Sequence, residues 1–201
     1  MDFADLATES CESSDLLLLS VAAEFRPVRW DEALERLDDL GRRVFGIAAL
    51  TPPEAAGELA RALTSGAGLR PDAAGIEGLL LDCVLRDRRG HPALLAFIFC
   101  EAARRAGVAA TVYSDPYRWY AGVRDDEGLV LVDPAGWSPQ AAAVPARLRP
   151  HCGHELAWMV LCGVEGRLRR SGAERTADRA AALRELLPVR RHTPDAGRDE
   201  R

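Results

Sequence analysis

The sequence contains no lysine, because all 26 of its basic residues are arginine. A lysine Schiff base and an internal lysine amine acceptor are therefore excluded. The chain also lacks an excess of positive charge, since 31 acidic residues give it a net charge of −5. Nucleic-acid binding depends on clustered positive charge that neutralises phosphates. We therefore expect no nucleic-acid partner.

Cysteine is scarce, and its pattern is not that of a disulfide scaffold. The five cysteines include no CxxC pair and are Cys11, Cys83, Cys100, Cys152 and Cys162. An odd, scattered set is typical of a reduced cytoplasmic protein. The acidic N-terminus lacks the basic region of a signal peptide, and no apolar run is long enough to cross a bilayer. We expect a cytoplasmic location and no membrane partner.

The sequence does have enough apolar residues for a core, at 48% hydrophobic and 28% charged. Its first third predicts three helices, at about residues 16–25, 31–45 and 51–66. The third helix has the strongest start signal. Thr51 can cap it, Pro52 suits its first turn, and Glu54 completes a capping box.

The middle third predicts a buried helix followed by a small sheet. Residues 75–87 look helical, and Arg88-Arg89-Gly90 interrupts them. Pro92 then opens PALLAFIFCEAARRAG, a helix apolar nearly all round. Three short strands follow, at residues 108–114, 119–124 and 128–133, with a hairpin turn at 125–128.

The final third predicts a helical hairpin over residues 154–172 and 173–187, joined near Gly172. The expected contact sets Leu156, Met159 and Val160 against Ala182, Leu183 and Leu186. The whole chain is predicted to be α+β, with three parts. These are N-terminal helices plus core at 1–150, the hairpin at 151–188, and a disordered tail at 189–201.

This order of parts resembles the transglutaminase-like core of the papain-like superfamily. In active members a Cys begins the buried helix, a His lies on the next strand, and an Asp follows on the third. The stretch DCVLRDRRGHPALLAFIFCEAARRAGVAATVY and the later DPAGW resemble the SirB-type branch. The terminal helices resemble that branch's N-terminal helices and its tetratricopeptide-like hairpin, so the resemblance covers roughly residues 10–188.

The resemblance also implies that the catalytic triad has been lost. The nucleophile position holds Pro92, and the His position holds Arg118, or Trp119 if one residue is inserted. Neither can act as a base at neutral pH, since Arg stays charged and Trp is not basic. Asp133 is kept, either as a turn former before proline or as a salt-bridge partner of Arg118.

Polar and aromatic residues near the presumed cleft are the candidate binding residues. His91 directly precedes Pro92 and could either cap the helix or line the cleft. The aromatic residues could form a binding surface or seal the cleft as additional core. The full candidate set is His91, Tyr113, Tyr117, Arg118, Trp119, Tyr120, Asp133 and Trp137.

Other reactive residues carry weaker signals. Cys100 lies two turns inside the buried helix, away from the positive helix end that lowers a thiol pKa. Cys83 precedes two arginines but has no evident His partner. His151-Cys152-Gly153-His154 has metal-ligand residue types, yet Pro150 and Gly153 favour a loop and no full ligand set is near, so polar residues that cap the following helix are the favoured interpretation. We expect no metal site and no cofactor.

Three functions remain open from the sequence. The first is a pseudoenzyme that binds a protein, peptide or small molecule, with a cleft filled by Trp119 or Tyr120, or with an exposed apolar patch. The second is a repurposed enzyme, in which His91, Arg118 and Asp133 converge in an open pocket; a specialised biosynthetic pathway would suit it. The third, ranked lowest, is a cysteine enzyme using Cys83 or Cys100.

Overall fold

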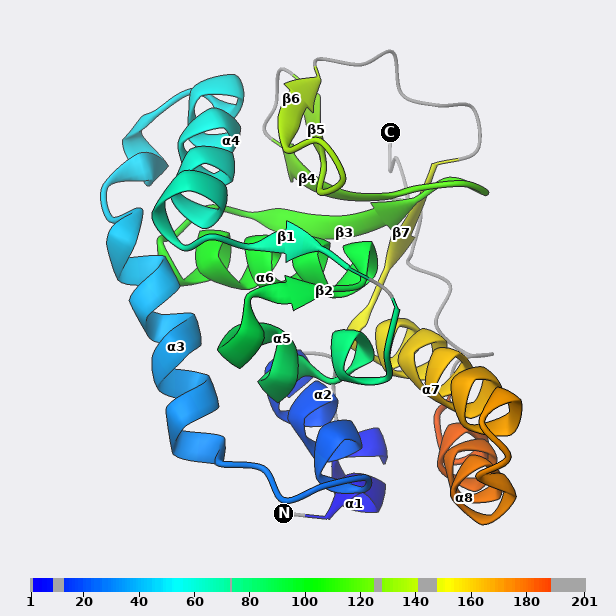
Figure 1. Ribbon diagram of the computed structural model, residues 1–201. Helices are drawn as coiled ribbons and strands as arrows, with labels where there is room; N and C mark the ends of the chain where they lie inside the picture. Colours follow the sequence, from blue (N-terminus) through cyan, green and yellow to red (C-terminus); the bar gives the residue numbers. More distant parts are fainter. Residues whose placement is uncertain (1, 9–12, 73, 125–127, 141–147, 189–201) are drawn as a thin grey trace.

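The fold is built on one buried helix packed against a five-stranded antiparallel sheet (Figure 1). The computed structural model describes residues 2–8, 13–72, 74–124, 128–140 and 148–188. The strands lie in the order β6-β5-β4-β3-β7. They are β3 (Ala110–Ser114), β4 (Trp119–Arg124), β5 (Leu129–Asp133), β6 (Ser138–Gln140) and β7 (Arg149–His151). The expected α+β class is confirmed, and β6 and β7 extend the three predicted strands.

The buried helix is α6 (Pro92–Arg105), and its sequence explains its position. Every residue from Ala93 to Ala103 is buried, so no polar face remains to meet water. Pro92 suits the first turn because it lacks only an N–H that has no partner there anyway. The helix ends before Gly107, whose φ of 80° is left-handed.

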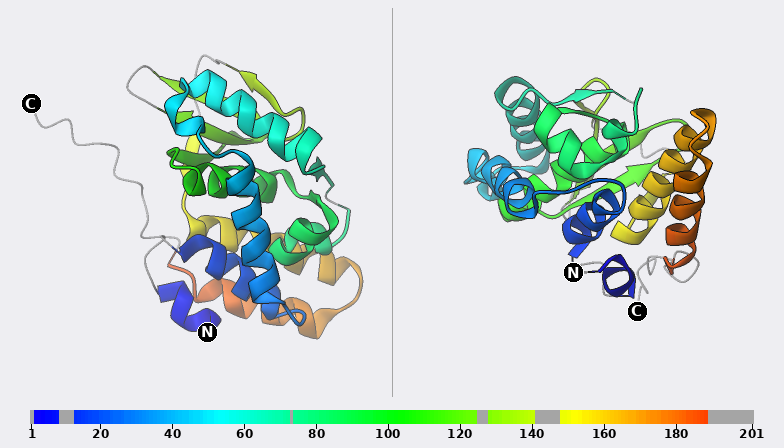
Figure 2. Two further views of the ribbon diagram at one scale, coloured as in Figure 1. Left: turned by 90° about the vertical axis from the view of Figure 1, so that its left-hand side faces the viewer. Right: turned by 60° about the horizontal axis from the view of Figure 1, so that its bottom comes forward.

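The N-terminal helices, drawn in blue to cyan, pack around this core (Figure 2). They are α1 (Phe3–Thr8), α2 (Ser14–Ala23), α3 (Trp30–Arg43) and α4 (Pro52–Arg61). The capping box at Thr51 is confirmed, because its backbone N–H donates to the Glu54 carboxylate at 3.1 Å. The sequence did not predict α1. None of the helices in the described residues is long and apolar enough to cross a membrane.

The predicted helix at 75–87 is wrong in its first half. A short 3-10 turn (Glu77–Leu79) comes first, and α5 begins only at Leu81 and ends at Asp87. Leu80 separates the two because its backbone is extended, with φ −105° and ψ 119°. Two short segments, β1 (Arg70–Pro71) and β2 (Arg89–Gly90), then pair in parallel beside α6.

The helical hairpin consists of α7 (Gly153–Arg170) and α8 (Glu174–Glu185), which lie side by side (Figure 2). The expected contact face is only partly right on α8, because Leu183 packs against the core whereas Ala182 and Leu186 are exposed. Ala177 and Ala180 are buried instead, because small side chains let the two helices approach closely. Strand β7 crosses the expected domain boundary at residue 150, and α7 also packs on α2.

Two predictions fall outside the described residues. The hairpin turn at 125–128 lies there for residues 125–127, and so does the predicted disordered tail at 189–201.

Gly122 in β4 leaves room for the Tyr113 ring on the outer face of the sheet. A Cβ at Gly122 would lie 2.5 and 2.7 Å from two Tyr113 ring carbons. We expect Gly122→Ala to lower the free energy of unfolding by about 1–3 kcal/mol through overpacking. Urea denaturation measures it, and Gly128→Ala is the control because a Cβ there meets nothing within 4 Å. Equal midpoints for the two variants would contradict this account of Gly122.

Candidate functional site

A cleft of about 620 Å³ opens where the first turn of α6 meets the start of β4 and the end of β5. It is lined mainly by residues that the sequence singled out: His91, Pro92, Tyr117, Arg118, Trp119 and Asp133. Ala135 and Gly136 complete the wall. The cleft is therefore open, so the expectation that Trp119 or Tyr120 fills it in a binding module is wrong.

The Arg118 guanidinium and the Asp133 carboxylate form an ion pair in this cleft. Arg118 Nη1 donates to Asp133 Oδ2 at 3.2 Å, and Asp133 Oδ1 accepts from the amide of Ala135 at 2.8 Å. The Asp133 side chain is 11% exposed, whereas that of Arg118 is 61% exposed. Asp133 thus acts both as a turn former and as a salt-bridge partner. Arg118, and not Trp119, faces Asp133.

A turn ahead of β4 fixes the position of Arg118. Asp115 Oδ1 accepts from the amides of Tyr117 at 2.7 Å and Arg118 at 2.8 Å. The Tyr117 amide, together with the Tyr120 hydroxyl and the Arg118 amide, holds the pKa of Asp115 below its ordinary value. Arg118 is consequently set just before the strand, with its side chain on the cleft.

His91 both caps α6 and lines the cleft. Its Nδ1 accepts a hydrogen bond from the amide of Ala93 at 3.2 Å, which leaves the proton of the neutral ring on Nε2. Burial, and then the charge of Arg167, lower the pKa of His91. Its ring lies edge-on to Trp119 with centroids 6.5 Å apart. The expected convergence is partial, since within the described chain no hydrogen bond links His91 to Arg118 or Asp133.

Behind Trp119 lies a polar cluster that the sequence did not reveal. The rings of Trp119 and His151 have centroids 4.8 Å apart. His151 Nε2 lies 2.7 Å from Ser114 Oγ, and its Nδ1 lies 3.6 Å from the carboxylate of Glu155. Burial lowers the pKa of His151, while Glu155 raises it and Arg149 lowers it. Of this cluster, the sequence analysis had singled out only His151, as a residue of a possible metal-ligand segment.

The segment from His151 to His154 is not the loop that the sequence suggested. His151 ends β7, Cys152 caps α7, and Gly153 is the first residue of that helix. The Glu155 carboxylate accepts from the Cys152 amide at 3.2 Å, which confirms the capping interpretation. Among the described residues, no group of three or more His, Cys, Asp or Glu side chains could hold a metal ion.

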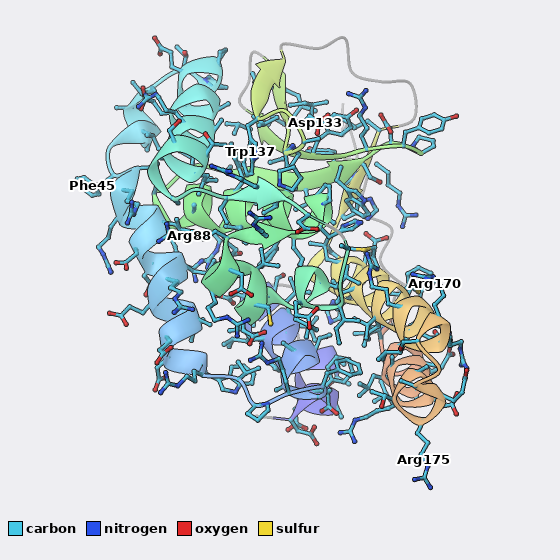
Figure 3. The ribbon with its side chains drawn as sticks, in the orientation of Figure 1. Phe45, Arg88, Asp133, Trp137, Arg170 and Arg175 are labelled. Atoms are coloured by element: carbon cyan, nitrogen blue, oxygen red, sulfur yellow. The ribbon has the colours of Figure 1, made fainter. Side chains whose placement is uncertain are left out.

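Three predicted aromatic residues lie outside the cleft wall. Tyr113 and Tyr120 form a separate apolar cluster with Leu131, because alternate strand residues face opposite sides of the sheet. The Tyr120 hydroxyl donates to Asp115 at 2.8 Å, and burial followed by this bond raises the pKa of Tyr120 to about 12. Trp137 follows Asp133 across the β5–β6 turn (Figure 3) and packs against the main core.

The buried cysteines do not line the cleft. Burial, and then the charge of Glu101, raise the pKa of Cys100. Burial also raises the pKa of Cys83, with a further contribution from Asp82. A raised pKa leaves little thiolate at neutral pH, so neither side chain is an activated nucleophile.

We expect stability to fall as the pH drops from about 7.5 to about 5.5. The pKa values of His91 and His151 are below their ordinary 6.5 in the folded protein. Below about pH 6.5 the unfolded chain therefore binds more protons than the folded protein does. The contribution of the two neutral rings to stability is complete above that pH and is lost as the pH falls below it. Melting temperatures across this range measure the effect.

The variants His91→Asn and His151→Asn isolate the contribution of the two rings. Asn can still cap α6 but does not titrate. Between about pH 7.5 and about pH 5.5, the melting temperature of the double variant should therefore fall much less than that of the wild type. A decrease as large as that of the wild type would contradict the assignment.

Comparison with known proteins agrees with this geometry. Residues 31–158 match the family model described as "Transglutaminase-like superfamily". No curated protein and no solved structure gave a match. The match covers more than half of the chain and includes α6, β3, β4, β5 and the whole cleft wall. The chain therefore belongs to the transglutaminase-like superfamily.

Proposed function

We propose that the cleft is a ligand-binding site in a catalytically degenerate transglutaminase-like protein, which acts as a binding or accessory module. The observation that carries this proposal is Pro92, which stands at the head of α6 and lines the same cleft as the Arg118–Asp133 ion pair. A proline ring offers no nucleophile, and a guanidinium does not release its proton at neutral pH. Thiol catalysis of the superfamily type therefore has neither its nucleophile nor its base here.

The cleft suits a small molecule or the end of a peptide. Its volume of about 620 Å³ lies within the range of small-molecule sites. Trp119 and Tyr117 offer apolar faces, while Asp133 offers an acceptor and Arg118 a donor. A ligand with an apolar group beside an amide-like polar group would match both kinds of wall. Because the cleft is open, we favour binding inside it over binding at another surface of the protein.

A repurposed enzyme is the second candidate, favoured by the shared position of His91, Arg118 and Asp133 on one cleft. Such an enzyme would use the neutral His91 ring and the ion pair for acid–base or anion-binding roles. A specialised biosynthetic pathway would suit it. This candidate differs from the first because it requires turnover of the bound molecule.

We also propose that the chain belongs to the SirB-type branch and that α7 and α8 are its tetratricopeptide-like hairpin. The RRGHP and DPAGW segments support the branch, and the packing of α7 on α8 supports the hairpin. The scattered cysteines support a cytoplasmic location. The partner would be a protein or small molecule and neither a nucleic acid nor a membrane.

Tryptophan indole signals in a ¹H–¹⁵N NMR titration test the binding proposal. The probes are N-acetyl amino-acid amides with aliphatic, aromatic and acidic side chains. We expect at least one probe to shift the Trp119 indole signal in a saturable way and to leave Trp158, on α7, unchanged. Trp119→Ala should remove this signal, which assigns it to Trp119. Conversion of a probe to product would favour the enzyme, and an unresponsive Trp119 signal with every probe would overturn binding in the cleft.

A further inference from the structure

A second hollow, about 180 Å³ in volume, lies between α3 and α5, away from the cleft. Four arginines and one acid line it: Arg36, Asp39, Arg43, Arg86 and Arg88. Apolar side chains from α3, α5 and the 67–69 segment form its floor. Such a concentration of positive charge is notable in a chain whose net charge is −5.

Carboxylates neutralise only part of this charge. Arg86 is paired with Asp87 through two hydrogen bonds of 2.7 Å, and Arg36 lies 3.9 Å from Glu32. The Arg43 guanidinium donates to a backbone carbonyl, that of Gly66, at 3.3 Å. For Arg88, the described part of the chain places no carboxylate within 4.0 Å. Positive charge therefore remains at the end of the hollow formed by Arg43 and Arg88.

These two guanidiniums flank a single turn. Arg43 binds the carbonyl of Gly66, and a Cβ on Gly68 would lie 3.7 Å from Arg88 Cδ and 3.8 Å from its Nη1. Arg88 also has a left-handed backbone, with φ 59°, at the end of α5. Glycine is the favoured residue at such a position, because other residues are strained there. Arg88 keeps a side chain over the turn despite that strain (Figure 3).

We propose that this hollow binds a phosphoryl group, either as inorganic phosphate or at the end of a phosphomonoester. Guanidinium groups pair with phosphate oxygens through two parallel hydrogen bonds. The hollow is smaller than sites for whole drug-sized molecules, so it fits one anionic group. The adjoining hollow shares Arg36 and Arg86 with this one and also contains Glu32 and Asp82. Arg43 and Arg88 do not line that hollow, so those two carboxylates do not offset their charge.

Thermal unfolding in sodium phosphate and in sodium chloride, at equal ionic strength and pH, tests the proposal. The wild-type melting temperature should rise saturably with phosphate beyond its value in chloride. Arg88→Gly removes the guanidinium and also relieves the backbone strain. This variant should melt in chloride no lower than the wild type, yet lose the phosphate response. Arg43→Ala should weaken the apparent phosphate affinity about tenfold.

Arg175→Ala is the matched control, because Arg175 is an exposed arginine on α8, far from the hollow (Figure 3). It should keep the full phosphate response. Phenyl phosphate, titrated in parallel, distinguishes the source of the group. Tighter binding than that of phosphate supports a phosphomonoester, and equal binding supports the free ion. A wild type that responds no more to phosphate than to chloride, or an Arg88→Gly variant that responds fully, would overturn the proposal.

Discussion

Pro92→Cys combined with Arg118→His should turn the cleft into a thiol–imidazole–carboxylate site that hydrolyses p-nitrophenyl acetate. The introduced thiol would lie in the first turn of α6, where the positive helix end and a nearby cation lower a thiol pKa. The introduced imidazole would face Asp133, in the place where the Arg118 guanidinium now pairs with it. Iodoacetamide should label the introduced thiol about a hundredfold faster at neutral pH than the native Cys83 or Cys100, because burial raises the pKa of both native thiols.

The single variants separate nucleophile from base. Pro92→Cys alone should release one equivalent of p-nitrophenolate and then stop, because no imidazole activates water to hydrolyse the acetyl-enzyme. Adding Arg118→His should allow turnover, with a gain of about a hundredfold in the hydrolysis step. Pro92→Ala should show neither reaction. Ester turnover by the wild type at a rate near that of the double variant would refute the proposed loss of catalysis.

The sequence was sufficient for elements whose signals are local. The buried helix is recognisable because its apolar residues continue through every turn from Ala93 to Ala103. The capping box at Thr51 depends on only four residues, and it forms as expected. The strands β3, β4 and β5 are each rich in β-branched or aromatic residues. Local chemistry alone fixes these parts, so no tertiary information was needed.

The sequence was insufficient where the outcome depends on distant pairing. Strands β6 and β7 have three residues each, too few for an alternating pattern, and both contain proline. Their pairing with β5 and β3 is what makes them strands. The contact of His151 with Ser114 and Trp119 follows from that pairing, so no local motif could indicate it.

The candidate site shows the same division. Sequence order brought His91, Pro92 and Asp133 to one cleft, but it left Arg118 and Trp119 as alternatives. The turn at Asp115 decides between them, because its carboxylate fixes the amide of Arg118 before the strand begins. The side of the sheet that Tyr113 and Tyr120 face was also misjudged, since a shift of one residue reverses the facing of a strand side chain.

Arg105→Met should destabilise the fold by about 3 kcal/mol, because it leaves buried carboxylates without a positively charged partner. The Arg105 side chain is 14% exposed and joins three helices. Its Nη2 lies 2.8 Å from Asp15 on α2, its Nε lies 2.7 Å from Asp38 on α3, and its Nη1 contacts Glu101. Methionine keeps much of the chain length but none of the charge. Loss of about 6–12 °C in melting temperature is expected for a chain of this size.

Arg104→Met is the matched control for this prediction. Arg104 is the adjacent residue on α6 and also pairs with Glu101, at 2.8 Å, but its side chain is 57% exposed. Solvent screens such a pair, so we expect a change below about 1 kcal/mol. Equal losses for the two variants would show that charge burial is not the cause.

A rescue variant identifies the carboxylate that is left without its partner. Adding Asp15→Asn to Arg105→Met removes the charge on Asp15, whose side chain is only 12% exposed, and should recover part of the lost stability. Gly41 makes this junction possible, because a Cβ there would lie 2.5 Å from Arg105 Cβ and would push α3 away from α6. The N-terminal helices are thus held to the core by a buried charge cluster at the opposite end of α6 from the cleft. Its removal should lower stability while leaving the Trp119 indole environment in the folded protein unchanged.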